Sequence, residues 1–126
     1  MPKFLSLTDI IVINQTLIKD FGGLHAIRDN SLLESAAYAP QSTFDSKYLY
    51  PTIYEMAAAY AYHIIKNHPF VDGNKRTGLM TMLVFLESNK KQVYFKSNEL
   101  YNLGIEIATS SITIRKIALL LKNHSA

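Results

Sequence analysis

The chain has 126 residues, 48% hydrophobic and 18% charged, a composition typical of a single globular domain and unlike that of a disordered chain. It contains no cysteine, which excludes disulfide bonds and thiolate metal sites and makes a reducing cytoplasm the expected compartment. The net charge of +3 is spread along the chain rather than gathered in a basic stripe, so it does not indicate a direct nucleic-acid partner.

The first third of the chain predicts two helices. "SLTD" (residues 6–9) has the spacing of a capping box, in which a hydroxyl and a later carboxylate satisfy backbone N–H groups at a helix start. The helix that follows should end at the glycines of "FGG" (21–23), which tolerate a left-handed backbone. A second helix begins near residues 30–31 and stops before Pro40. The first helix has an apolar face formed by Ile10, Ile13, Leu17 and Phe21.

Residues 41–51 are polar and aromatic without clear periodicity, and we expect a loop or a small hairpin there. They lead into a central helix, for which Thr52 and Glu55 again have capping-box spacing. Small alanines on its apolar stripe indicate that neighbouring helices approach it closely. This stripe consists of Ile53, Met56, Ala57, Tyr60, Ala61 and Ile64.

The second half of the chain predicts three more helices. "RTGLMTMLVFLESN" (76–89) is apolar on nearly every side, which is typical of a buried helix. A short extended piece over 91–95 and two closing helices over 97–110 and 112–124 follow, with Ser97 as the N-cap of the first. We therefore expect one all-α domain over residues 1–126, a compact bundle of about six helices without a signal peptide or a membrane span.

Reactive side chains are concentrated in "HPFVDGNKRTG" (68–78), between the central helix and the buried one. This position places residues 72–75 at a helix N-terminus, where unpaired backbone N–H groups and the helix dipole favour an anion. Gly73 lets the backbone turn tightly and approach a ligand. Lys75 and Arg76 add positive charge where the dipole is already positive, and a phosphate chain would relieve this conflict.

Other residues of this segment fit the same interpretation. Asp72 offers an oxygen ligand of the kind that Mg²⁺ uses together with substrate phosphates. His68 is the nearby side chain that exchanges a proton near neutral pH, and Asn74 either holds the turn or donates to a phosphate. Each residue also has an ordinary structural explanation, such as a turn, a helix end or a surface charge. Those explanations leave the conflict between the cations and the dipole unresolved, which favours the phosphate site.

Spacing excludes two other kinds of site. A P-loop would need adjacent lysine and hydroxyl residues, an upstream glycine and a preceding strand, whereas Lys75 and Thr77 are not adjacent. A histidine–carboxylate metal hydrolase would need more ligands, because His63 lies five positions before His68 and well off its helical face.

The segment closely resembles the signature of Fic-domain proteins, commonly written H-P-F-x-[D/E]-G-N-G-R-x-x-R. It matches this signature at His68, Pro69, Phe70, Asp72, Gly73, Asn74 and Arg76. The short chain, the early "FGGLHAIRDNSLLESA" and the lysine at position 75 are more similar to the death-on-curing (Doc) branch, the toxins of bacterial toxin–antitoxin pairs. The resemblance covers nearly the whole chain.

The resemblance implies a role for each matching residue. His68 would be the general base that deprotonates a hydroxyl of a target protein, and Asp72 would bind a Mg²⁺ ion that bridges the phosphates of ATP. Phe70 would anchor the loop in the core, as aromatic residues of polar loops usually do. The anion-binding turn, which also takes part in catalysis, would consist of Gly73, Asn74, Lys75 and Arg76. In Fic proteins a flap before the central helix docks the target, which implies docking by Phe44, Tyr48 and Tyr50.

Two departures from the signature bear on the reaction. Lys75 replaces a glycine, and Leu79 stands where a second arginine orients the terminal phosphates in Fic enzymes that transfer AMP. The Doc branch is similar in both respects. The resemblance then implies a kinase that transfers the γ-phosphate of ATP to a threonine of elongation factor Tu and so blocks translation. Transfer of AMP to a protein hydroxyl is the first alternative, and an inactive module that binds nucleotide or antitoxin is the second.

Many Fic proteins carry an inhibitory helix, [S/T]-x-x-x-E-[G/N], whose glutamate pairs with the second arginine. This motif is absent from the chain, and Leu79 replaces its arginine partner. We therefore expect control by a separate protein, the cognate antitoxin, with a disordered segment that folds as a helix in an apolar groove.

Overall fold

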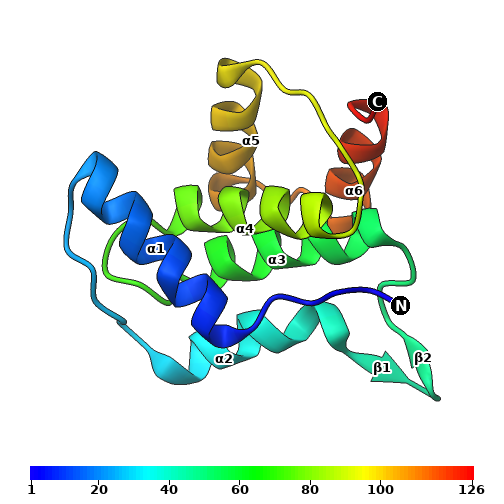
Figure 1. Cartoon of the computed structure of the whole chain (residues 1–126), viewed down its shortest axis with the longest axis horizontal. Helices are drawn as coiled ribbons and strands as arrows, with labels where there is room; N and C mark the ends of the chain where they lie inside the picture. The colour runs from blue at the N-terminus through cyan, green and yellow to red at the C-terminus, as the bar shows by residue number, and fades with distance from the viewer.

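The computed structural model describes residues 1–126 and contains six α-helices, one 3₁₀ helix and one small hairpin (Figure 1). The helices are α1 (Leu7–Phe21), α2 (Asn30–Tyr38), α3 (Ile53–Asn67), α4 (Asn74–Ser88), α5 (Ser97–Thr109) and α6 (Ile114–Asn123). The 3₁₀ helix η1 (Ala39–Gln41) follows α2, and β1 (Thr43–Phe44) pairs antiparallel with β2 (Lys47–Tyr48). The prediction of an all-α bundle of about six helices is confirmed. No helix has the length and hydropathy that a transmembrane span requires.

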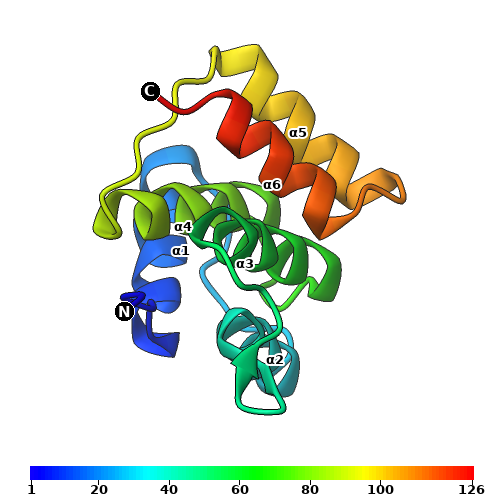
Figure 2. The ribbon, with the colours of Figure 1, turned by 90° about the vertical axis from the view of Figure 1, so that its right-hand side faces the viewer.

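α3 is the central helix of the bundle. It contacts α4 along its length, while α2 lies on one side of this pair and α5 and α6 lie on the other (Figures 1 and 2). The predicted stripe is buried from Met56 to Ile64, but Ala58 and Ala59, which lie outside the stripe, are fully buried as well. Small side chains let helices pack on several faces of α3, so this helix is enclosed on nearly every side.

α4 is less enclosed than its sequence predicts. Met80 is 39% exposed, and Leu83 and Val84 are only half-buried, because α1 and α5 leave part of the helix surface uncovered. The prediction of a helix buried on nearly every side is therefore wrong for α4, and it describes α3 better.

The helix ends follow local hydrogen bonding. Ser6 and Asp9 form the predicted capping box, with bonds of 3.1 and 2.8 Å between each side chain and the other residue's backbone N–H. The prediction of Ser97 as an N-cap is wrong. The carboxylate of Glu99 accepts from the N–H of Lys96 at 3.0 Å, so Lys96 is the cap and the helix has already begun at Ser97. The extended piece over 91–95 forms no strand, only an isolated bridge between Val93 and Ser125.

Two glycines let three helices approach one another beside the loop that joins α3 to α4. A Cβ on Gly78 of α4 would lie 2.8 Å from Ile65 Cγ1 and 3.2 Å from the Ala61 carbonyl oxygen of α3. A Cβ on Gly104 of α5 would lie 2.9 Å from Leu79 Cδ1 of α4. The end of α3, the start of α4 and the middle of α5 therefore surround one small space.

Candidate functional site

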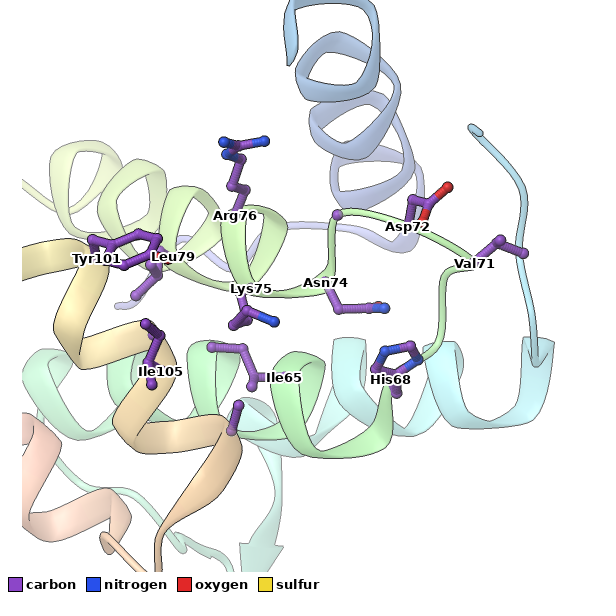
Figure 3. Close-up of a pocket in the computed structure, with 13 residues that line it drawn as sticks. Ile65, His68, Val71, Asp72, Asn74, Lys75, Arg76, Leu79, Tyr101 and Ile105 are labelled. Atoms are coloured by element: carbon purple, nitrogen blue, oxygen red, sulfur yellow. The ribbon is translucent and has the colours of Figure 1, made fainter. Parts of the chain in front are cut away.

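His68 ends α3 and turns the chain toward the loop. Its backbone is left-handed, with φ of 51° and ψ of 53°, a conformation that is unfavourable for a residue with a Cβ. Arg28 stabilises this end of the helix, because its guanidinium donates to the carbonyl oxygens of Asn67 and His68 at 2.9 and 2.6 Å. The imidazole of His68 is exposed at the edge of a cavity (Figure 3).

The loop after His68 is fastened to the core by Phe70 and Asn74. The Phe70 side chain is fully buried, and the Asn74 amide makes two hydrogen bonds of 2.9 Å with the Phe70 backbone, accepting from its N–H and donating to its carbonyl oxygen. The side chain of Asn74 thus holds the turn. A phosphate would meet the backbone N–H of Asn74 rather than its amide.

The N-terminus of α4 has no partner for its first N–H groups. Gly73 is the N-cap, with φ of 82°, no side chain caps the helix, and its first turn has no acidic residue. The N–H groups of Asn74, Lys75 and Arg76 accordingly donate to no group of the protein. Unpaired N–H groups and the positive end of the helix dipole are the features that an anion-binding site requires.

Asp72 lies immediately before this turn, on the side that faces α1. Its Oδ2 accepts a hydrogen bond of 2.8 Å from the N–H of Leu24, in the segment that follows α1. No hydrogen bond engages Oδ1, and the side chain is exposed. The protein contains no cluster of three or more histidine, cysteine, aspartate or glutamate residues arranged to bind a metal. A single accessible carboxylate suits Mg²⁺, which takes few protein ligands when phosphates supply the others.

A cavity of about 370 Å³ lies between the loop, α4 and α5 (Figure 3). His68 and Lys75 lie on the side that faces α3 and α5, whereas Asp72 and Arg76 lie toward α1. The lining residues of the loop and the start of α4 are mostly polar, namely His68, Val71, Asp72, Gly73, Asn74, Lys75 and Arg76, and the others are mostly apolar, namely Ile65, Leu79, Tyr101, Gly104, Ile105 and Ala108. A cavity with a polar and an apolar part suits a ligand that joins phosphates to an aromatic ring.

Leu79 occupies the position of the second arginine of the Fic signature. It is only 8% exposed, packs against Gly104 of α5 and lines the apolar part of the cavity. No side chain at this position offers a positive charge to a phosphate.

Arg76 is held on the α1 side of the site. Its guanidinium carbon lies 4.3 Å from the centre of the Phe21 ring, in the geometry of a cation–π contact. Phe21 belongs to the apolar face predicted for the first helix, but its side chain is 62% exposed. The ring supports the side chain of Arg76 instead of filling the core.

The aromatic residues predicted to dock a target lie away from the cavity. Phe44 and Tyr48 belong to the hairpin, and Tyr50 follows it, just before the first turn of α3, whereas His68 ends that helix (Figure 1). None of the three lines the cavity, and the fifteen residues of α3 between the hairpin and His68 span about 22 Å. Phe44 is 79% exposed, but the half-buried Tyr48 packs on Phe4. The Tyr50 side chain reaches back along α3, since its hydroxyl lies 3.4 Å from Nε2 of His63, five residues before His68. Burial raises the pKa of Tyr50 and lowers that of His63.

Two contributors to the site escaped the sequence analysis. Tyr101 lies on the apolar wall of the cavity, and only the packing of α5 against α4 brings it there. Asn14 is fully buried in α1 and donates to the carbonyl oxygen of Asp72 at 3.0 Å. Its signal was visible in the sequence, since position 14 falls on the apolar face between Ile10 and Leu17, where a polar residue needs a partner.

The sequence is similar to that of known proteins over its whole length. A profile described as the Fic/DOC family matches residues 4–86. The chain is 32% identical to a protein named Toxin Doc from Mycolicibacterium smegmatis, in an alignment that covers 100% of this chain and 96% of that protein. It is 30% identical to a protein named Protein kinase doc from Escherichia phage P1, over 92% of this chain and 90% of that protein. The chain therefore belongs to the Fic/DOC family, in the branch of the Doc toxins.

Proposed function

We propose that the chain is a toxin that transfers the γ-phosphate of ATP to a hydroxyl group of a target protein. The observation that carries this proposal is the uncapped N-terminus of α4, with unpaired N–H groups and Lys75 in the same cavity as His68. The names of the relatives, Toxin Doc and Protein kinase doc, support both parts of the proposal. Each alignment covers nine-tenths or more of both chains.

Each residue has one task in the proposed reaction. The turn from Gly73 to Arg76 binds phosphate oxygens through backbone N–H groups, and Lys75 adds a positive charge. His68 accepts the proton of the target hydroxyl while that oxygen bonds to the γ-phosphorus and ADP departs. Asp72 would hold Mg²⁺, which neutralises phosphate charge when it is bound.

The leucine at position 79 favours γ-phosphate transfer over AMP transfer. The arginine that orients the terminal phosphates in AMP-transferring Fic enzymes is missing, because Leu79 occupies its position. The terminal phosphate must then be oriented elsewhere, and the turn of α4 offers unpaired N–H groups for it. The γ-phosphate would then bind at this turn. In AMP-transferring Fic enzymes the same turn would hold the phosphate that they transfer.

The proposal extends to two protein partners. The target implied by the resemblance is elongation factor Tu, whose modification at a threonine would block translation. Because the inhibitory helix motif is absent, a separate antitoxin would silence the site. Failure to isolate a stable complex with the product of the neighbouring gene would count against this arrangement.

The test is to incubate the purified protein with elongation factor Tu, ATP and Mg²⁺ and to determine the intact mass of the target. The parent protein and the control His124→Gln, which alters a histidine outside the cavity, should each add one phosphate, and His68→Ala should add none. A gain of one AMP would establish the alternative Fic reaction. No modification by the parent protein would refute transfer to this target and favour a binding module.

A further inference from the structure

One buried side chain ties the phosphate-binding turn to α1. Asn14 is fully buried, and its Nδ2 donates to the carbonyl oxygen of Asp72 and to Oγ1 of Thr77, each at 3.0 Å. Asp72 precedes the first turn of α4, and Thr77 immediately follows it. The amide of Asn14 therefore spans the residues that would surround a phosphate.

The orientation of this amide follows from its partners. The carbonyl oxygen of Asp72 can only accept a hydrogen bond, so the Asn14 atom that faces it must be the nitrogen. Oδ1 of Asn14 then faces Nδ1 of His25, 2.7 Å away, and His25 must carry a proton on Nδ1 to donate to it. The network has one consistent arrangement and holds each member in a single orientation.

The same part of the chain also positions the carboxylate of Asp72. Leu24, the neighbour of His25, donates its N–H to Oδ2 of Asp72 at 2.8 Å. Gly73 has no Cβ, which would otherwise lie 3.2 Å from Nδ2 of Asn14. Contacts from α1 and the segment after it therefore fix the backbone of Asp72, its side chain and the first turn of α4 relative to one another.

We propose that Asn14, supported by His25, is a positioning residue for the nucleotide site. It touches no substrate, and it holds Asp72 and the N–H groups of α4 at the separation that phosphates and their metal ion require. This inference depends on the proposed function, because it needs ATP to bind at this turn.

The network can be tested by ATP binding measured with titration calorimetry in the presence of Mg²⁺. Thr77→Val removes the hydroxyl that Asn14 contacts and keeps the shape of the side chain, whereas Thr77→Ser restores the hydroxyl. We expect Thr77→Val and Asn14→Leu to weaken ATP binding by about tenfold, the effect of one lost hydrogen bond, and Thr77→Ser to bind ATP nearly as the parent does. If Asn14→Leu does not fold, the comparison of Thr77→Val with Thr77→Ser tests the proposal.

The matched control is Asn89→Ala. Asn89 also makes hydrogen bonds with backbone groups, to Lys3 and Phe85, but at the opposite end of α4. This variant should unfold at a lower temperature and still bind ATP as the parent does. ATP binding that is unchanged in Thr77→Val and Asn14→Leu, or weakened equally in Asn89→Ala, would overturn the positioning role alone. A parent protein that binds no ATP would overturn the proposed function, and this inference with it.

Discussion

Replacing Asn74 with alanine should destabilise the whole fold, even though the residue belongs to the Fic signature. Its side-chain amide satisfies the backbone N–H and carbonyl oxygen of Phe70, which have no other partner. Phe70 and Asn74 are 0% and 5% exposed, so water does not reach these groups easily. The variant leaves one donor and one acceptor buried without hydrogen bonds.

The size of the effect follows from these two bonds. A buried polar group that loses its partner costs about 1–3 kcal/mol, and two such groups cost roughly 2–4 kcal/mol when the loop relaxes partly. Domains of this size are stable by about 5–15 kcal/mol, so Asn74→Ala should remove a large share of the free energy of unfolding. At about 3–6 °C per kcal/mol, the midpoint of thermal unfolding should fall by roughly 6–24 °C.

Urea unfolding of the parent and of Asn74→Ala measures this difference without any substrate. Asn67→Ala is the reference for a single lost hydrogen bond. Asn67 makes one partly buried bond, from Nδ2 to the Leu32 carbonyl oxygen at 3.0 Å, and the loss of this bond should cost about 1 kcal/mol. If Asn74→Ala loses ATP binding but unfolds like the parent protein, the side chain is a phosphate ligand and our interpretation of its role is wrong.

Three further predictions concern other parts of the structure. Phe21→Ala should weaken ATP binding about two- to fivefold in calorimetry, because the Arg76 guanidinium loses its cation–π contact. Phe21→Trp should restore ATP binding, and tighter binding by Phe21→Ala would contradict the prediction. Gly78→Ala should lower the free energy of unfolding, measured in urea, by about 1–3 kcal/mol. Alanine has the better helix propensity, but its Cβ would lie 2.8 Å from Ile65 Cγ1. Equal stability of the variant and the parent would refute the close packing. Hydrogen bonds to the Leu120 carbonyl and to Glu99 raise the pKa of His124 above 6.5, so its stabilisation is complete below pH 6.5 and is lost as pH rises through the raised value. The stability difference between the parent protein and His124→Gln should therefore shrink as the pH rises above 6.5, and a difference that grows would contradict it.

Periodicity in the sequence predicted the helices because most of them pack through one apolar stripe. The alanines of α3 show where this reasoning stops. Ala58 and Ala59 are outside the stripe, and only the assembled bundle shows that helices cover them too. Conversely, Met80 of α4 belongs to an apolar run but stays partly exposed, since no helix lies over it. Burial on a second face depends on neighbours that a single helix does not specify.

The candidate site was located in the sequence, whereas its internal contacts were not. The spacing of the motif placed residues 72–75 at a helix N-terminus because loop and helix are local features. The contacts of Asn14 with Thr77 and of Phe21 with Arg76 join residues more than fifty positions apart. Such contacts depend on the crossing of α1 over α4, which no local pattern describes.

The central claim is that ATP phosphates bind at the first turn of α4. Backbone amide chemical shifts, followed by NMR during titration with ATP and Mg²⁺, test it most directly. The account predicts the largest shifts at the N–H groups of residues 73–76 in the parent protein and in His68→Ala, because His68 serves the reaction and not the binding. Shifts that leave this turn unchanged and gather elsewhere on the molecule would contradict it.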